Sequence, residues 1–189
     1  LELDHNSDES KNKDISIIRE KLNHLDQIAG RILDFGKSRE SFRRNYSLPE
    51  ILKDASLLVR LKLEQSQVNL SVNQANPNIT VFVDKGQIQQ ALLNLILNAL
   101  GAMPKGGSLE IESFINSDNR AEVLVSDTGT GIPEDLRAQI FDSFLTARTD
   151  GTGLGLTISK RILRSHDGDL ELVKSDESGT VFKLTLPVC

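Results

Sequence analysis

Hydrophobic positions near the start of the chain follow a helical period. Between residues 15 and 32 they recur at spacings of three and four, which predicts an amphipathic helix with a narrow apolar seam. So narrow a seam favours packing against another helix of a bundle over docking on the helix's own domain. The seam residues are Ile15, Ile18, Leu22, Leu25, Ala29 and Ile32.

A second helix is predicted from Ser47 to about Gln65. Ser47 and Glu50 have the spacing of a capping box, and Pro49 suits the first turn because its missing N–H has no partner there anyway. The residues expected to face inward are Ile51, Ala55, Leu58 and Val59.

Beyond residue 65 the pattern changes to short strands in adjacent pairs, separated by helices. Two helices are predicted at about 86–103 and 155–166, and residues 127–153 form a loop region with several glycines. Paired strands between helices predict an α+β fold, a two-layer sandwich with helices on one face of a mixed sheet. The predicted strands are 68–73, 80–83, 108–114, 121–127, 170–175 and 181–186.

The helix at about 86–103 is apolar on nearly every side, which is typical of a buried helix. One polar line interrupts it. That line must face either a cavity with a ligand or an internal hydrogen-bond network, and the residues alone leave both possibilities open. The line consists of Gln87, Gln90, Asn94, Asn98 and Gly101.

Two glycine-containing segments follow. Asp127 ends a predicted strand, and Gly129 and Gly131 after it would let the backbone pass close to a bulky ligand, although an ordinary turn has the same composition. Residues 151–155 lead into a helix, where free N–H groups and the helix dipole favour phosphate. Their spacing is neither that of a P-loop nor that of a Rossmann fingerprint.

Composition narrows the class of protein further. A formal net charge of −5 on 189 residues argues against sequence-independent binding of nucleic acid. No apolar run is long enough to span a bilayer, and no signal peptide is recognisable. The single cysteine, Cys189, excludes a disulfide framework within the chain, and the three histidines lack the spacing of a metal site. We therefore expect a cytoplasmic protein without membrane contact of its own.

In their order and separation, these segments resemble the Bergerat ATP-binding fold of the GHKL superfamily over about residues 48–188. Within it the chain is most similar to sensor histidine kinases of two-component systems, of the nitrogen-regulatory kind. The matching segments are "NLILNALGAM" for the N box, "DTGTGIP" for the G1 box, "FDSFLTA" for the F box and "GTGLGL" for the G2 box.

This resemblance implies a site for ATP or ADP with Mg²⁺. Asn98 would ligate the Mg²⁺ ion, and Asp127 would accept a hydrogen bond from the adenine amino group. Asn94 stands where ATP-hydrolysing relatives carry a Glu, which favours transfer over hydrolysis because an amide cannot act as a base. Asn94 and Arg148 are the expected catalytic residues. The nucleotide-binding set is Asn94, Asn98, Asp127, Gly129, Gly131, Ile132, Arg148, Gly151, Thr152, Gly153, Leu154, Gly155 and Thr180.

The same resemblance divides the chain into residues 1–45, part of a dimerisation and phosphoacceptor hairpin, and residues 46–189, the catalytic domain. None of the histidines matches the acceptor motif: His5 and His24 have the wrong neighbours, and His166 ends a helix, where a cation is favourable. The acceptor is therefore expected outside this chain. Gly101 stands near a lysine of many relatives, for which Lys105 or Arg148 could substitute.

The expected function is that of an ATP-dependent protein-histidine kinase core. Its partners would be the phosphoacceptor hairpin of the same kinase and the receiver domain of a response regulator, with a homodimer in the full-length protein and no nucleic acid. A membrane anchor elsewhere in the parent protein stays open. The alternatives are a degenerate nucleotide-binding regulatory module, or a GHKL-type kinase or ATPase with another acceptor such as Ser.

Overall fold

The computed structural model describes residues 41–143 and 153–189. The chain divides into two compact units, Leu1–Glu40 and Ser41–Cys189, and the second is described here. The predicted helix at residues 15–32 lies outside the described residues.

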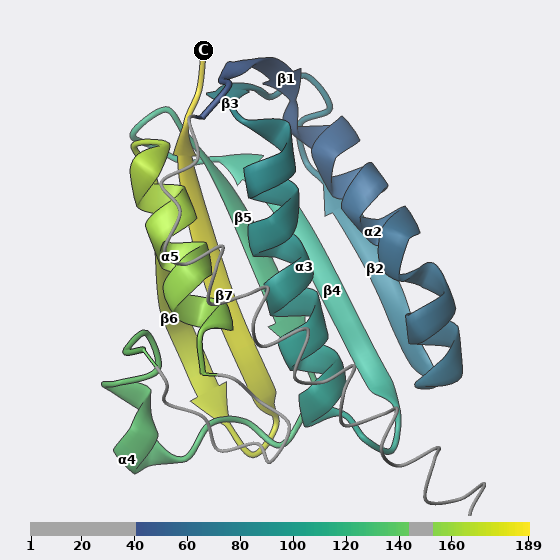
Figure 1. Cartoon of the computed structure of the whole chain (residues 1–189). Coiled ribbons are helices and arrows are strands. Elements are labelled where there is room, and N and C mark those ends of the chain that lie inside the picture. Colours follow the sequence, from purple (N-terminus) through teal and green to yellow (C-terminus); the bar gives the residue numbers. More distant parts are fainter. Residues whose placement is uncertain (1–40, 144–152) are drawn as a thin grey trace, which may run out of the picture. The chain divides into compact units, whose positions relative to one another are not determined.

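A five-stranded mixed sheet forms one layer of the Ser41–Cys189 unit, in the order β2-β4-β5-β7-β6. Strands β2 and β4 are parallel, and the other neighbours are antiparallel. Helices α2 (Leu48–Gln65), α3 (Lys85–Ala102) and α5 (Gly155–Ser165) cover one face of this sheet (Figure 1). The predicted α+β, two-layer fold is confirmed. The strands are β2 (Val68–Gln74), β4 (Gly107–Ile115), β5 (Arg120–Asp127), β6 (Asp169–Asp176) and β7 (Gly179–Pro187).

The core lies between the helices and the sheet. Alternate residues of β4, β5 and β7 point towards the helices, because successive side chains of a strand lie on opposite faces. Of the three helices that cover the sheet, α3 is the most buried, and it lies between α2 and α5 (Figure 1). Its buried residues are Ile88, Ala91, Leu92, Leu95, Ile96, Ala99 and Leu100.

A second, two-stranded sheet was not predicted from the sequence. Strand β1 (Arg44–Ser47) pairs antiparallel with β3 (Thr80–Val83), so that Ser47 lies opposite Thr80. The backbone N–H of Leu48 donates to the carbonyl of Ile79 at 2.9 Å. The capping-box prediction was wrong, because Ser47 belongs to this strand pair and its side chain makes no capping hydrogen bond.

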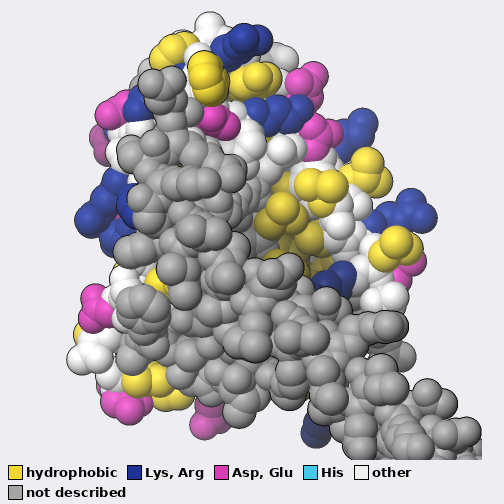
Figure 2. Space-filling view, viewed as in Figure 1, with side chains coloured by type: hydrophobic (Ala, Val, Ile, Leu, Met, Phe, Trp, Pro, Cys, Tyr) yellow, Lys and Arg dark blue, Asp and Glu magenta, His cyan; other side chains and the backbone are white. Residues whose placement is uncertain are grey.

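The inward face of α2 differs from the prediction at one position. Leu58 is 67% exposed, whereas Leu52 is fully buried. Leu52 shares its face with Ala55 and Val59, at spacings of three and four, and Leu58 lies on the far side of the helix. Leu57 and Leu61 are also exposed, and hydrophobic side chains are visible where α2 lies, on the right of Figure 2. These extra leucines made the sequence pattern ambiguous.

Two further features complete the described part of the chain. A short helix, α4 (Glu134–Arg137), lies in the region predicted to be loop.

Among residues 41–143 and 153–189, no helix combines the length and the apolar character needed to cross a membrane.

Substitutions on the buried and the exposed face of α2 should lower the free energy of unfolding by different amounts. Leu52→Ala should lower the free energy of unfolding by about 2–5 kcal/mol, because it leaves a cavity in the core. Leu58→Ala, on the same helix, should change it by less than about 0.5 kcal/mol. Urea denaturation of both variants measures the difference, and equal losses would contradict the assignment of the buried face.

Candidate functional site

The polar line of α3 faces α5 at Asn94. The side-chain nitrogen Nδ2 of Asn94 donates to the carbonyl of Gly155 and to the hydroxyl of Ser159, each at 3.3 Å. Gly155 is the first residue of α5 and Ser159 lies one turn further on. Asn94 is thus part of an internal network that joins the two helices, one of the two possibilities that the sequence left open.

Asn98 differs from Asn94 in its surroundings. It lies one turn further along α3 and is half-buried, and its side chain hydrogen bonds with none of the residues that the structure describes. A neutral amide oxygen is a suitable ligand for Mg²⁺. The described residues contain no group of three or more His, Cys, Asp or Glu side chains that could hold a metal by themselves.

Asp127 is the last residue of β5, the middle strand of the five-stranded sheet, and lies opposite Thr180 of β7. Its Oδ1 atom accepts a hydrogen bond from the backbone N–H of Gly129 at 2.8 Å. Burial raises the pKa of the Asp127 carboxyl above its usual value, and the backbone N–H groups of Gly129 and Thr180 partly oppose that rise. An ionised carboxylate with two oxygens retains capacity to accept a further hydrogen bond from a ligand.

The loop after Asp127 packs against the end of α3. A Cβ atom on Gly129 would lie 2.6 Å from Cβ of Ala102, and the backbone N–H of Thr130 donates to the carbonyl of Ala102 at 3.2 Å. Ala102 is four residues after Asn98 and so shares its side of α3. This contact brings the Asp127 loop to the polar line of α3.

Gly131 turns the same loop with a φ of +70°. A Cβ atom there would lie 2.1 Å from the backbone carbonyl oxygen of Asp176, so a side chain would collide with β6. Both the conformation and the close approach therefore require glycine.

Ser175 holds the loop from the side of the sheet. Its hydroxyl accepts from the backbone N–H of Ile132 at 2.7 Å and lies 3.1 Å from the hydroxyl of Thr180. Ser175 and Thr180 are both buried, so Ser175 orders a loop residue and a strand residue of the predicted site. Ser175 was not predicted from the sequence; a polar residue at an inward position of a strand was the available signal.

The G2 segment is described only from Gly153 onwards. Gly153 has a φ of +66°, and Leu154 is buried, with its carbonyl accepting from the backbone N–H of Ile158 at 2.9 Å. Arg148, Gly151 and Thr152 lie outside the described residues.

Phe141, from the F-box segment, is held by α5 and β7. Its ring meets Phe182 edge to face at a centroid distance of 6.5 Å, and Nζ of Lys160 lies 4.2 Å from its centroid. The hydroxyl of Thr157 donates to its carbonyl at 2.9 Å. Lys160 and Thr157, which the sequence analysis also missed, fix the chain at residue 141 to the helix that begins at Gly155.

His166 is not a helix-end cation, so that expectation was wrong. Its side chain is fully buried, and Nε2 accepts from the backbone N–H of Asp84 at 3.0 Å. Nδ1 therefore carries the proton and donates to the carbonyl of Ile162 at 2.8 Å. Burial lowers the pKa of the imidazole, which keeps it neutral. His5 and His24 lie outside the described residues.

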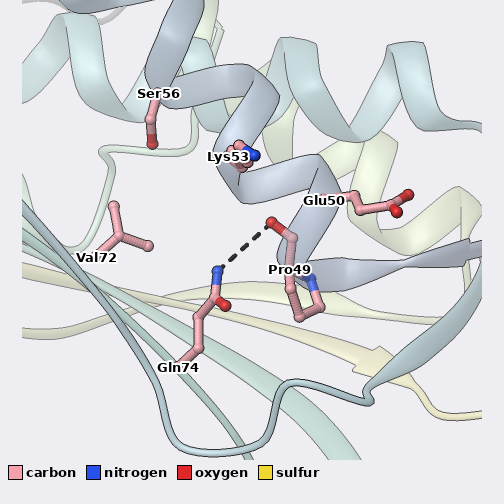
Figure 3. A pocket seen from close by; sticks show the side chains of 6 residues that line it. All are labelled: Pro49, Glu50, Lys53, Ser56, Val72 and Gln74. Carbon is pink, nitrogen blue, oxygen red and sulfur yellow. Dashed lines mark hydrogen bonds between the residues drawn. The ribbon is translucent and has the colours of Figure 1, made fainter.

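A separate groove of about 340 Å³ lies between α2 and β2, at the edge of the sheet. Nε2 of Gln74 donates to the carbonyl of Pro49 at 3.5 Å across it (Figure 3). Because β2 is an edge strand and Asp127 and Thr180 belong to inner strands, this groove is not part of the predicted site. Its lining residues are Pro49, Glu50, Lys53, Ser56, Val72 and Gln74.

Comparison with known proteins defines the class of this fold and site. Residues 83–189 match the family model described as histidine kinase-, DNA gyrase B- and HSP90-like ATPase. Signal transduction histidine-protein kinase AtoS of Escherichia coli is 29% identical over 92% of this chain and 29% of its own length. The catalytic domain of histidine kinase ThkA is 31% identical and has a TM-score of 0.69, over 77% of this chain and 95% of that domain. ThkA in complex with response regulator protein TrrA is 29% identical, with a TM-score of 0.79 over 94% of this chain and 51% of that one.

The chain belongs to the family of histidine kinase-, DNA gyrase B- and HSP90-like ATPases. Within that family, the Ser41–Cys189 unit has the fold of a histidine kinase catalytic domain, as the resemblance predicted. The chain spans less than half the length of the curated relatives it matches.

The buried, neutral His166 predicts a pH-dependent stability. An unfolded histidine gains its proton near pH 6.5, whereas the folded His166 resists protonation because its pKa is lowered. The unfolded state therefore binds more protons, and the stabilising contribution, complete above pH 6.5, is lost as the pH falls below that value.

Urea denaturation between pH 7.5 and 5 measures this effect as a falling free energy of unfolding. His166→Gln, whose amide can accept from Asp84 and donate to Ile162, should remove that part of the pH dependence. The other two histidines are present in both proteins and cancel in the comparison. Equal slopes in the two proteins would rule out His166 as the cause.

Proposed function

We propose that this chain binds ATP with Mg²⁺ and supplies the catalytic half of a protein-histidine kinase. The observation that carries the proposal is the difference between two amides on α3. Asn94 is bonded to α5, whereas Asn98 has no partner among the described residues and lies one turn before Ala102, where the Asp127 loop meets α3. Asn98 is half-buried, and its amide is not among the described buried polar atoms that lack a partner, so it is open to solvent and available to a ligand.

The roles of the described residues follow from their surroundings. Asn98 would offer its amide oxygen to Mg²⁺, and the ion would supply positive charge that neutralises the phosphates of ATP. Asp127, held by the backbone N–H of Gly129, would accept a hydrogen bond from the adenine amino group, with Thr180 opposite it on β7. Gly131 and Ile132 hold the loop against β6. The backbone from Gly153 through Gly155 would face the phosphates. Arg148, Gly151 and Thr152 are expected to complete that region.

The proposed reaction is transfer of the γ-phosphoryl group to an imidazole nitrogen. The lone pair of the imidazole nitrogen attacks the γ-phosphorus, the bond from that phosphorus to the bridging oxygen breaks, and ADP leaves with the bonding electrons. The proton on the other ring nitrogen would pass to an acidic residue beside the acceptor histidine. In such reactions the protein mainly positions the groups and stabilises charge. Asn94 cannot activate water as a base, and its Nδ2 is already engaged by Gly155 and Ser159, which supports transfer over hydrolysis.

The acceptor and the downstream partner lie outside the described unit. We propose that the part of a dimerisation and phosphoacceptor hairpin ends near residue 40 rather than 45, because β1 (Arg44–Ser47) pairs with β3 inside the Ser41–Cys189 unit. That unit would be the catalytic domain of a cytoplasmic, homodimeric kinase. The acceptor histidine would lie on that hairpin in the parent protein. A response regulator would then receive the phosphoryl group, a proposal supported by the complex of ThkA with TrrA.

Transfer of label from ATP tests this function. The chain is incubated with γ-labelled ATP and Mg²⁺, alone and with a separate hairpin that carries an acceptor histidine. Label on the hairpin that is labile to acid and stable to alkali is the expected result. Nucleotide binding without transfer to any hairpin would instead indicate a degenerate binding module, and label stable to acid would indicate a hydroxyl acceptor such as Ser.

Asp127→Asn tests the adenine end of the site. Replacing the acceptor-only carboxylate by an amide should raise the dissociation constant for ATP about ten-fold or more, because a hydrogen bond to a charged group is lost. Asp118→Asn, an exposed position in the turn between β4 and β5, is the matched control and should leave the constant unchanged. Calorimetric titration measures both. Unchanged affinity in Asp127→Asn would remove Asp127 from the site.

A further inference from the structure

Ser159 is a fully buried residue of α5 at the contact with α3. Its Oγ atom lies 2.9 Å from the carbonyl of Gly155, 3.4 Å from the carbonyl of Ala91 and 3.3 Å from Nδ2 of Asn94. A hydroxyl has one proton to donate, and both carbonyls can only accept. The proton therefore goes to the nearer carbonyl, that of Gly155, and the oxygen accepts from Asn94.

These contacts determine which way the Asn94 amide points. Its two N–H bonds are used by Gly155 and Ser159. The reversed amide would place Oδ1 against the carbonyl oxygen of Gly155, acceptor against acceptor. Oδ1 must therefore point away from this contact with α5.

We propose that Ser159 is a positioning residue for the phosphate end of the nucleotide site, an inference that rests on the proposed function. Ser159 keeps the Asn94 amide in one orientation and ties the first turn of α5 to α3. Both elements belong to the predicted phosphate region, whereas Asp127 lies at the adenine end. Ser159 touches neither nucleotide nor metal, because its side chain has no exposed surface.

Ser56 of α2 provides a comparison for Ser159, because it makes a local hydrogen bond within its helix but lies outside the predicted site. Ser56 of α2 donates to the carbonyl of Leu52 at 2.8 Å, the same local bond to the fourth preceding residue that Ser159 makes. Such a local bond adds little to stability, and Ala is the better helix former. Ser56→Ala removes this bond at a helix outside the predicted site and is the matched control.

The experiment compares the full 189-residue chain with Ser159→Ala, Ser159→Thr and Ser56→Ala, by titration with Mg–ATP and with AMP. Ser159→Ala should raise the dissociation constant for Mg–ATP about five- to ten-fold and leave that for AMP within about two-fold, because one hydrogen bond is lost at the phosphate end only. Ser159→Thr keeps a hydroxyl and should restore Mg–ATP binding. Ser56→Ala should match the unaltered chain for both ligands.

A second measurement needs no nucleotide. In ¹⁵N-NMR spectra, the side-chain amide signals of Asn94 should be resolved in the unaltered chain and should move in Ser159→Ala but not in Ser56→Ala. Signals that stay in place, or dissociation constants for Mg–ATP and AMP that rise equally, would overturn the role of Ser159. If the unaltered chain binds neither ligand, the proposed function itself fails; if it binds Mg–ATP and Ser159→Ala binds it equally well, only the role of Ser159 fails.

Discussion

The burial of α3 on nearly all sides is the constraint on which the site depends. On such a helix a polar side chain stands out, because it must either bond to a neighbouring element or stay open to solvent or a ligand. Asn94 is satisfied by α5. Asn98 is not satisfied within the described part of the chain, and the Asp127 loop reaches α3 one turn beyond it at Ala102. The ligand is therefore proposed at the amide of this helix that stays open to solvent and is not engaged by the described part of the protein.

The surroundings of the site are held by buried polar groups that would not touch the ligand. Ser159 joins the start of α5 to α3, Ser175 joins the loop at Ile132 to β7, and His166 joins the end of α5 to the N-cap residue of α3, Asp84. Each makes hydrogen bonds to elements far apart in the sequence. The helices and the loop that frame the site are therefore fixed relative to one another before any ligand arrives, which lowers the cost of binding.

The sequence predicted the strand pairs and helices of the sandwich because the strands alternate and turn residues separate the elements. It did not predict β1, whose pairing with β3 depends on residues more than thirty positions away, nor the inward position of Leu52 among several leucines of α2. Asn98 and Asp127 could be proposed because the glycine segments occur in a recognisable order. Ser159 could not, since its partner Asn94 is 65 residues away and a serine inside a helix carries no pattern of its own.

The central claim is that Asn98 and the Asp127 loop, rather than the groove beside α2, hold the nucleotide. An ¹⁵N-NMR titration of the chain with Mg²⁺ and a non-hydrolysable ATP analogue tests it most directly. The account predicts shifts of the Asn98 side-chain amide and of the backbone amides of Gly129 and Gly131, with Ser56 and Val72 unmoved. Shifts confined to α2 and β2, or an Asn98 side chain unaffected by saturating ligand, would contradict it.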